Sequence, residues 1–448
     1  MKDLSVFQTI LLVAFGALAI SGILVFALVV SNGTSNSIGP ITIWGTLPES
    51  AFTSVLRQVA EQDNRFSQVS YVEQDPVEYE SILTEALASG TGPDIFLLGH
   101  DQVMRNAGKV VPIPYDILSQ TQFKKTFVEA ANTYLAPNGV LGVPLVADPL
   151  VLYWNKDMFS ASGFATPPAY WDQLPGMAAK IVKKDDASRI LKSAVAFGEY
   201  QNVDHAKDIV ALLTMQAGGS LTERDATGKV VPTLSARTSG PQQATESALR
   251  FYTEFADPSK VDYSWNRALP SSRAAFAAGN LAIYLGYASE ARAIARTNPN
   301  LNFASAPVPQ IRGSEKVQSI ARVYALATSR ASAKPNAALN IASLMGDTNF
   351  VNAIAYTLDI PAARRDVLAA ALDQSAAANP LLTEGVCSGQ DVGVCSALFS
   401  LSWIDPDPQK TDAVFKDMIE SVTSGAQRPA EAIGRATQEM AQILEQVQ

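Results

Sequence analysis

Aromatic and polar residues stand near the predicted ends of several strands, where they could bind a polyhydroxylated ligand. An aromatic ring can stack on the apolar face of a sugar, while Asp, Asn, Arg or His side chains hydrogen-bond its hydroxyl groups. A buried polar group left without a partner is costly, so such a site rejects ligands with the wrong pattern of groups. The aromatic residues at these points are Trp44, Tyr153, Tyr200, Tyr287, Tyr324, Tyr356 and Trp403. Taken singly, each could instead pack in a core.

Polar candidates stand at the ends of two predicted strands. The first strand ends at Trp44 and is followed by Thr46, and a later strand, ending at Leu98, is followed by His100 and Asp101. In parallel α/β sheets, ligands bind outside the carboxyl ends of the strands. We therefore count Trp44, Thr46, His100 and Asp101 as candidate ligand contacts. His100 has a plainer interpretation as well, because a lone His in a loop often only hydrogen-bonds its neighbours.

Asp148 and Arg322 are the remaining charged candidates. Asp148 lies between two prolines, where it could hydrogen-bond within a hinge or accept a hydrogen bond from a ligand. Arg322 precedes a predicted strand at 324–328 and could bind hydroxyl or carboxylate groups, or pair with a surface acid. The ligand-binding set is completed by three aromatic residues: Tyr200, Tyr287 and Trp403.

No arrangement of residues predicts an enzyme. The sequence contains neither G-x-S-x-G nor H-E-x-x-H, and it has no phosphate-binding or dinucleotide-binding glycine motif. Its 2 His argue against a His-rich metal site, and its formal net charge of -9 argues against nucleic acid as a partner. We predict no catalytic residue, no cofactor and no metal. A glycosidase pair among the 43 Asp and Glu residues stays open, because no spacing singles one out.

The two cysteines, Cys387 and Cys395, lie in the segment VCSGQDVGVC. Outside the cytoplasm they could form a disulfide, and Gly389 and Gly393 would permit the tight turn. Two free thiols are the alternative. A metal site needs more ligands than this segment offers. We predict a disulfide that pins a loop.

The N-terminal segment predicts a membrane anchor. Residues 10–30 contain no charged side chain and, as a helix, would span the roughly 30 Å hydrocarbon core of a bilayer. A cleaved signal peptide, with its shorter apolar stretch, is the alternative. Lys2 supplies the positive charge before this segment, so we expect residues 1–9 in the cytoplasm and the bulk of the chain outside. Residues 31–40 are rich in Gly, Ser and Asn and read as a linker.

Strands and helices alternate after the linker. Strand patterns at 41–44, 69–72 and 93–98 are separated by helical patterns at 51–63 and 79–88. This β-α-β-α-β order predicts a parallel sheet covered by helices. Later strands are predicted at 193–197 and 281–285, and later helices at 171–183, 204–217, 241–255 and 425–448.

An interrupted apolar segment at 138–159, NGVLGVPLVADPLVLYWNKDMF, predicts a joint in the chain. Pro144 has no N–H to donate, so we expect an edge or broken strand here rather than a central one. Pro149 interrupts the segment again, and Asn155 then offers an N-cap for a short helix. The segment could pass from one lobe to another, although a single strand with a bulge explains it equally well.

The same segment resembles a known family. G-x-x-G-V-P followed by L-Y-W-N-K-D-M-F, with W-D-Q-L at 171–174, is similar to the extracellular solute-binding proteins of ABC importers, of the maltose-binding-like family 1. The block G-T-G-P-D-I-F at 90–96 and the segment 271–289, which leads to Tyr287, also resemble that family. The resemblance extends from about Ile41 to the C-terminus.

This resemblance implies a two-lobed α/β fold of the periplasmic-binding-protein type (type II), with a ligand cleft between the lobes. We expect residues 41–146 and 281–328 to form lobe 1, and residues 147–280 and 329–448 to form lobe 2. The resemblance further implies that Tyr287 faces the ligand and that the lobes close around it by a hinge motion.

The function implied by the resemblance is capture of a small solute, with sugars and oligosaccharides as the leading class, for delivery to ABC permease subunits. We expect the chain to act as a monomer. Two other functions remain open. One is a hydrolase that acts on surface glycans with a carboxylate pair in the cleft, and the other is a sensor subunit that presents its closed form to a membrane receptor.

Overall fold

The computed structural model describes residues 39–236, 243–314, 316–375 and 391–447, apart from the side chains of 373–375. The predicted anchor at 10–30 and Cys387 lie outside these ranges. Within them, no helix combines the length and the apolar character that a bilayer crossing requires. Cys395 is buried, and its bridge to Cys387 stays a prediction.

The first lobe is built on three parallel strands. β1 (Ile41–Gly45) lies between β2 (Val69–Glu73) and β3 (Ile95–Gly99), and α2 (Glu49–Gln62) and α3 (Tyr79–Ser89) are the connecting helices. Alternate residues of β1 are buried, and Phe52 of α2 stacks on Tyr71 of β2 with ring centroids 4.0 Å apart. The predicted β-α-β-α-β unit is confirmed.

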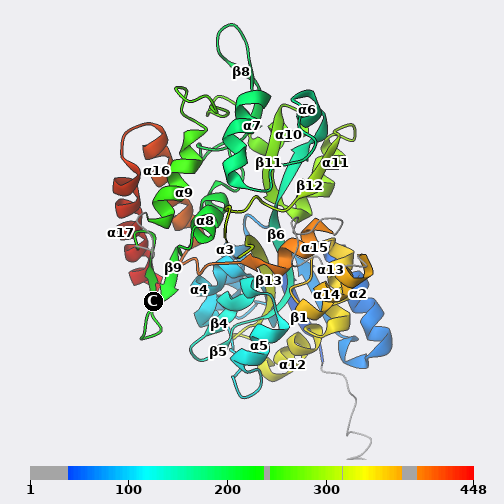
Figure 1. Cartoon of the computed structure of the whole chain (residues 1–448). Coiled ribbons are helices and arrows are strands. Elements are labelled where there is room, and N and C mark those ends of the chain that lie inside the picture. Colours follow the sequence, from blue (N-terminus) through cyan, green and yellow to red (C-terminus); the bar gives the residue numbers. More distant parts are fainter. Residues whose placement is uncertain (1–38, 237–242, 315, 376–390, 448) are drawn as a thin grey trace, which may run out of the picture.

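The second lobe is built around β11 (Leu281–Tyr287), all of whose residues are buried. β11 runs antiparallel to β6 (Val143–Asn155) and parallel to β8 (Ile190–Val195). In Figure 1 this lobe forms the upper body, with two C-terminal helices along its left side. Its longer helices are α7 (Leu174–Ile181), α8 (Ala206–Gln216), α9 (Ala244–Glu254), α16 (Pro408–Thr423) and α17 (Pro429–Val447).

Two predictions for this lobe, the Asn155 cap and the C-terminal helix, are confirmed. The Asn155 side chain accepts hydrogen bonds from the backbone N–H of Asp157 and Met158 at 3.0 and 3.1 Å, and so caps α6 (Lys156–Ala161). The apolar face of the C-terminal helix is buried, namely Ala432, Ile433, Ala436, Met440, Ile443 and Leu444.

The division of the chain between the lobes differs from the predicted one. β11 and β12 (Phe303–Ala306) pair with the second half of β6 and belong to lobe 2, although residues 281–328 were expected in lobe 1. Conversely, α12 (Pro335–Met345) and α13 (Thr348–Leu358) bury their apolar residues in the lobe 1 core. The expected boundaries are wrong because an amphipathic pattern shows that one face is buried, but not which of two bodies covers it.

Three segments cross between the lobes. β6 has residues up to Ala147 in the lobe 1 core and residues from Leu150 in the lobe 2 core. β13 (Ser319–Thr328) crosses in the opposite direction and pairs with β6 and with β3. The short β14 (Ser400–Leu401) pairs with the start of β13 and carries the chain back into lobe 2. The lobes therefore share one sheet, seen at the waist of the molecule in Figure 1.

β6 is a single strand with an irregular register, not the edge or broken strand that the prolines suggested. It lies between β13 and β11, so it is central. The register shifts where Tyr324 pairs with Val146 and Ala325 pairs with Pro144, which leaves Leu145 unmatched. A bulge of this kind accommodates a residue that lacks an N–H. The alternative of one bulged strand is thus correct, and this strand still joins the two lobes.

Asp148 and Arg322 are register partners at the crossing of β6 and β13. Asp148 is only 4% exposed, and its two carboxylate oxygens accept hydrogen bonds from the backbone N–H and the hydroxyl of Ser289 at 3.0 and 2.6 Å. Burial raises the pKa of Asp148 to about 6, although the Ser289 hydrogen bonds and the charge of Arg322 act in the opposite direction. Asp148 therefore lies at the crossing between the lobes, with its carboxylate hydrogen-bonded within the protein.

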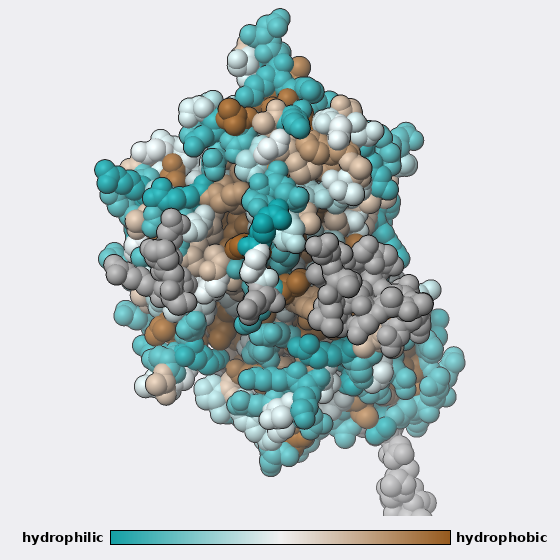
Figure 2. Space-filling view, viewed as in Figure 1, coloured by the Kyte–Doolittle hydropathy of each residue, from teal (hydrophilic) through white to brown (hydrophobic). Residues whose placement is uncertain are grey.

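One face of the molecule is drawn in Figure 2. On the face drawn in Figure 2, hydrophilic side chains cover most of both lobes, and the apolar side chains form small separate patches. The apolar residues of each lobe are largely used in its own core.

A turn that follows β8 yields the first prediction. Gly198 follows β8 with φ +94°, and a Cβ there would overlap Ala256 Cβ and lie 2.9 Å from the Ala256 nitrogen. Gly218 has φ +82° with open space around it. Gly218→Ala should cost roughly 1–2 kcal/mol from the left-handed conformation alone. Gly198→Ala should cost about 1–3 kcal/mol more, because crowding is added. Denaturant unfolding of both variants checks this, and equal losses would contradict it.

The hinge carboxylate yields a pH prediction. Unfolded Asp148 ionises near pKa 3.8, whereas in the folded chain it keeps its proton up to about pH 6. The folded state therefore binds more protons between these values, and the wild type loses stability as the pH rises through them. Asp148→Asn, which cannot ionise, should gain stability relative to the wild type over that window, by up to about 3 kcal/mol. Urea unfolding at a series of pH values measures the difference. If Asp148→Asn instead became less stable relative to the wild type as the pH rises, the folded protein would favour the charged form of Asp148.

Candidate functional site

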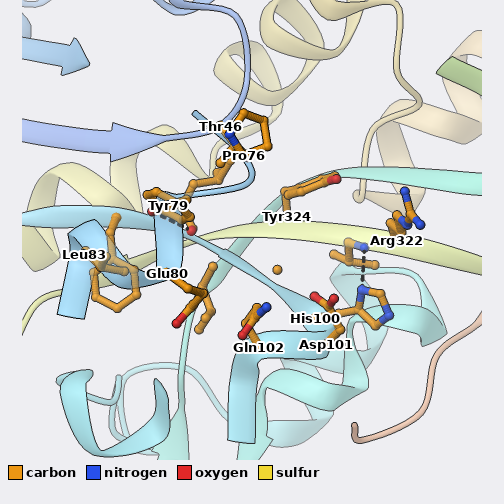
Figure 3. Close-up of a pocket in the computed structure, with 15 residues that line it drawn as sticks. Thr46, Pro76, Tyr79, Glu80, Leu83, His100, Asp101, Gln102, Arg322 and Tyr324 are labelled. Carbon is orange, nitrogen blue, oxygen red and sulfur yellow. Dashed lines mark hydrogen bonds between the residues drawn. The ribbon is translucent and has the colours of Figure 1, made fainter. Parts of the chain in front are cut away.

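Two adjacent cavities lie where the lobes meet. One, of about 540 Å³, is lined chiefly by lobe 2, and we call it the lobe-2 compartment. The other, of about 230 Å³, lies against the ends of β1 and β3, and we call it the lobe-1 compartment (Figure 3). Both are lined by His100, Asp101 and Arg322. Together they form a cleft with walls from both lobes and from a crossing strand.

The lobe 1 wall comes from the carboxyl ends of parallel strands. Thr46 follows β1, and a short 3-10 turn of His100, Asp101 and Gln102 follows β3. His100 is 8% exposed, and its Nδ1 accepts a hydrogen bond from the Val323 N–H at 3.3 Å. Burial lowers the pKa of His100, so the ring is neutral and its Nε2 carries the hydrogen. Asp101 makes no hydrogen bond or ion pair with any residue that the structure describes.

Arg322 stands at the centre of the cleft. Its guanidinium carbon lies 3.9 Å from the centroid of the Tyr287 ring, a cation–π contact. Its Nη2 lies 3.4 Å from Asp208 Oδ2, and its side chain stays 40% exposed because it faces the cavities. Burial lowers the pKa of Arg322, but the groups around it, Tyr287 and Asp208 foremost, outweigh that effect and raise the pKa. Its remaining donors are available to a ligand.

Side chains of lobe 2 form a hydrogen-bonded network in contact with Arg322. The Tyr287 hydroxyl donates to Asp208 Oδ2 at 2.7 Å. His205, the N-cap residue of α8, has φ +63° and is held by Glu290, with Nε2 and Oε1 2.6 Å apart. Burial raises the pKa of Asp208, but Arg322, His205 and Lys207 outweigh it, so the pKa is lowered and Asp208 is ionised. His205 has a left-handed backbone conformation and is held by Glu290, so its side chain has a defined position in the cleft wall.

Lys207 organises the far wall of the lobe-2 compartment. Its Nζ lies 3.1 Å from Asp405 Oδ2 and 2.7 Å from Asp412 Oδ1. Burial lowers the pKa of Lys207, but these carboxylates outweigh it and raise the pKa, so the ammonium group is retained. Asp405 is buried and also accepts a hydrogen bond from the Thr411 hydroxyl at 2.8 Å. Lys207, Asp405 and Asp412 thus form one set of charges in lobe 2 that are paired with one another.

The structure brings most of the sequence-predicted residues together. Five of them line the lobe-2 compartment, namely His100, Asp101, Tyr200, Arg322 and Trp403. Thr46 lines the lobe-1 compartment together with three of these. Their contacts with a ligand remain predictions.

Three predicted residues line neither compartment. Trp44 is half-buried and packs against the lobe 1 core. Asp148 is buried at the hinge. Tyr287 is 2% exposed and its ring is covered by Arg322, so the expectation that it faces the ligand is not met in this structure. The sequence pattern placed Tyr287 at a strand end, but not beneath an arginine from a distant strand.

Several cleft residues were missed by sequence reasoning. Lys207 and Asp208 lie in the first turn of α8, soon after Tyr200, and Asp405 lies soon after Trp403. Their closeness to predicted aromatic contacts was a usable signal. Nothing in the sequence indicates that Lys207 and Asp405 meet, because they are far apart along the chain.

The arrangement is suited to binding polar groups. Among the described residues, no group of three or more His, Cys, Asp or Glu is placed to hold a metal ion. The cleft instead offers aromatic rings, carboxylates, an imidazole N–H and a guanidinium, all of which can hydrogen-bond or stack.

Solved structures share this architecture. A cyclic α-maltosyl-1,6-maltose binding protein from Arthrobacter globiformis is 17% identical and superposes with a TM-score of 0.71 over 91% of this chain and 100% of that chain. An ABC transporter solute binding protein from Thermotoga lettingae, bound with α-D-tagatose, is 21% identical, with a TM-score of 0.65 over 91% of this chain and 100% of that chain. At these identities the likeness establishes the two-lobed fold.

Sequence comparison gives a shorter match and a family. A binding protein of Brucella abortus is 33% identical over 103 residues, which are 22% of this chain and about a quarter, 24%, of that relative. The model for bacterial extracellular solute-binding proteins matches residues 51–345, more than half of the chain. That family consists of binding proteins rather than enzymes, which agrees with the prediction of a chain without catalytic residues. The chain is therefore a member of the bacterial extracellular solute-binding protein family, as its resemblance to the maltose-binding-like proteins indicated.

Proposed function

We propose that the chain captures a sugar or oligosaccharide in the cleft between its lobes and delivers it to the permease of an ABC transporter. The observation that carries this proposal is a cavity lined at once by lobe 1, by lobe 2 and by the strand that joins them. The similar proteins from Arthrobacter globiformis and Thermotoga lettingae, which are described with carbohydrates, support it.

The chemistry of the cleft supports a carbohydrate ligand. Tyr200 in the lobe-2 compartment and Tyr324 in the lobe-1 compartment are half-buried and offer ring surface on which a sugar can stack, whereas Trp403 is only 5% exposed. Asp101, His100 and Arg322 provide acceptors and donors for hydroxyl groups. A combined cavity of this size falls within the range of roughly 300–1,000 Å³ found for small-molecule sites.

Closure of the lobes would follow from the ligand's contacts with both walls. A ligand shifts a conformational equilibrium only through its different affinity for the two states. In this structure the lobes already touch beside the cleft. Arg105 Nη1 of lobe 1 lies 3.7 Å from Asp407 Oδ1 of lobe 2, and Arg224 Nη2 of lobe 2 lies 3.4 Å from the Leu135 carbonyl of lobe 1. These contacts would hold the closed form.

The family and the N-terminal sequence support the location that we propose. The matched family is extracellular. We place the lobes outside the cell as a monomer tethered by residues 10–30, with residues 1–9 in the cytoplasm. This arrangement rests on the apolar sequence of that segment.

Ligand binding should be visible as a gain in thermal stability. A sugar at 100 times its dissociation constant adds about 2.7 kcal/mol to the stability of the protein. Asp101→Asn should weaken binding by tenfold to about a hundredfold, because a hydrogen bond to a charged group contributes about 1.5–3 kcal/mol. The unliganded variant should melt like the wild type, since Asp101 has no ion pair or hydrogen bond to lose among the described residues.

A thermal-shift screen of sugars, amino acids and polyamines, followed by calorimetric titration, makes these measurements. Shifts with amino acids but with no sugar would refute the proposed class of ligand. Unchanged affinity in Asp101→Asn would remove this residue from the binding site.

The contacts between the lobes should slow ligand release. The Arg105–Asp407 ion pair contributes about 0.2–1 kcal/mol, and the Arg224–Leu135 hydrogen bond contributes about 0.5–1.5 kcal/mol. Arg105→Ala and Arg224→Ala should therefore raise the dissociation rate by up to about fivefold and about tenfold, respectively. Arg189→Ala is the matched control, because its partner Asp185 lies in the same lobe. Stopped-flow displacement gives the rates. Equal release from wild type, variants and control would mean that these contacts do not hold the lobes closed.

A further inference from the structure

The cleft lies along one edge of the two crossing strands. The outer edge of β13 pairs with β3 of lobe 1 and, further along, with β14. His100 and Asp101 follow β3, Trp403 follows β14, and all three line the lobe-2 compartment. Arg322 of β13, which lies between these two pairings, lines both compartments. The β13 edge of the crossing is therefore the cleft edge.

The opposite edge of the crossing, along β6, also brings the lobes together. The Ala147 N–H of β6 donates a hydrogen bond to the Pro361 carbonyl of lobe 1 at 2.8 Å. Just beyond it, Leu150 of β6 pairs with Tyr287 of β11 in lobe 2. Because β6 lies between β13 and β11, these pairings are on the side of β6 that faces away from the cleft edge.

An ion pair joins the lobes on this β6 edge. Arg292 of α11 (Ala291–Thr297) belongs to lobe 2, and Asp359, the C-cap residue of α13, belongs to lobe 1. Arg292 Nε and Asp359 Oδ2 are 2.6 Å apart. Asp359 comes shortly before Pro361 in the chain, and Arg292 comes shortly after Tyr287. The ion pair thus spans the two lobes where their chains leave β6.

The first turn of α15 (Val392–Leu398) lies in the same place. Val392 packs against the lobe 2 core, whereas Ala397 of the same helix is buried in the lobe 1 core. A Cβ added to Gly393 would lie 3.2 Å from the Cβ of Ala288 in lobe 2 and 3.4 Å from Pro361 Cγ in lobe 1. We use the name rear contact for four residues: Ala288, Arg292, Asp359 and Gly393.

The rear contact and the contacts beside the cleft lie on opposite sides of the crossing. In Figure 1, α11, α13 and α15 are to the right of β6, whereas α8 and α4 (Val103–Asn106), which adjoin the cleft, are to its left. A rotation about the crossing that brings the cleft walls together therefore moves the rear residues apart. A rotation that opens the cleft presses the rear residues together.

In this structure the rear contact is fully made. The distance of 2.6 Å between Arg292 and Asp359 is that of a direct charge-assisted hydrogen bond, whereas Arg105 and Asp407 beside the cleft are 3.7 Å apart. Gly393 and Ala288 leave too little room for an added methyl group at van der Waals distance. Further opening would thus meet a steric limit, and closing would break an ion pair.

We propose that the rear contact limits how far the lobes open and, because it favours the open form, lowers the affinity of the cleft for its ligand. This inference rests on the proposed closure of the lobes around a ligand and adds what opposes that closure. The apparent affinity of a ligand depends on the fraction of the protein in the conformation that binds it. Weakening the rear contact should therefore tighten binding, although none of its four residues lines either compartment.

Two variants weaken the rear contact in different ways. Arg292→Ala removes the ion pair, and Gly393→Ala inserts a methyl group against Ala288. Each should raise the ratio of closed to open molecules. For Arg292→Ala the increase should be up to about fivefold, the upper value for an exposed ion pair. Because Arg292 is mostly exposed, its replacement leaves the fold intact even if Gly393→Ala does not fold.

Each variant has a matched control. Arg312 and Asp172 also lie 2.6 Å apart with comparable exposure, but both belong to lobe 2, so Arg312→Ala should leave the ratio unchanged. Gly434 is a helical glycine of α17 with open space around it, so Gly434→Ala adds a methyl group without touching the rear contact.

The distance between two spin labels measures the ratio in the unliganded chain. Val77 and Ala413 are exposed and stand next to Pro76 and Asp412, which line the lobe-1 and lobe-2 compartments. Labels attached through p-acetylphenylalanine at these two positions leave the cysteines unaltered. Pulsed electron paramagnetic resonance should show more molecules with short distances in Arg292→Ala and Gly393→Ala, while both controls match the wild type.

Titration with glucose, maltose, maltotriose and cellobiose then measures the effect on binding. A sugar that binds the wild type should bind Arg292→Ala and Gly393→Ala more tightly, in proportion to the gain in closed molecules, and should dissociate from them more slowly.

The outcomes separate this inference from the proposed function. If a sugar shortens the label distance in the wild type, but both variants match their controls or shift to longer distances, the inference is overturned and the proposed function stands. If the variants shift in the unliganded chain but only amino acids bind, the inference stands and the proposed class of ligand is refuted.

Discussion

Two strands shared by both lobes, β6 and β13, are the constraint on which the rest of the structure depends. Each strand buries residues in two cores, with Val146 and Leu150 of β6 on opposite sides of the crossing, and Val323 and Ile320 of β13 likewise. Pulling the lobes apart would expose both cores at once, and apolar burial is the main source of their stability. Bending at the crossing exposes neither core. This arrangement is compatible with the proposed closure, because a rotation about the crossing leaves the residues of each strand in their own cores.

Charged residues are concentrated at this crossing, where they are expensive to bury. Asp148 and Arg322 face one another in register, and each is compensated from lobe 2, Asp148 by Ser289 and Arg322 by Tyr287 and Asp208. Buried charges are tolerated only when such partners satisfy them. Because Arg322 belongs to a crossing strand and also lines both compartments, any ligand that contacts it acts directly on the joint.

The two walls of the cleft differ in how complete they are. In lobe 2, Lys207 is paired with Asp405 and Asp412, and His205 with Glu290, so that wall is organised before a ligand arrives. In lobe 1, Asp101 lines both cavities and makes no hydrogen bond or ion pair with any described residue. A wall that is already paired loses little freedom on binding, whereas an unpaired wall gains hydrogen bonds from the ligand.

The sequence by itself determined the local elements and the ends of strands. The parallel unit from β1 to β3, the Asn155 cap and the buried face of α17 follow from spacing and residue type, because these features depend on neighbours a few positions away. The same reasoning placed His100 and Asp101 at a strand end and so in the cleft. Only the tertiary structure decided which lobe α12 and β11 join, that Arg322 covers Tyr287, and that Lys207 meets Asp405. A periodic pattern shows that a face is apolar or that a charge needs a partner, but the partner's identity is set by chain crossings that join distant segments.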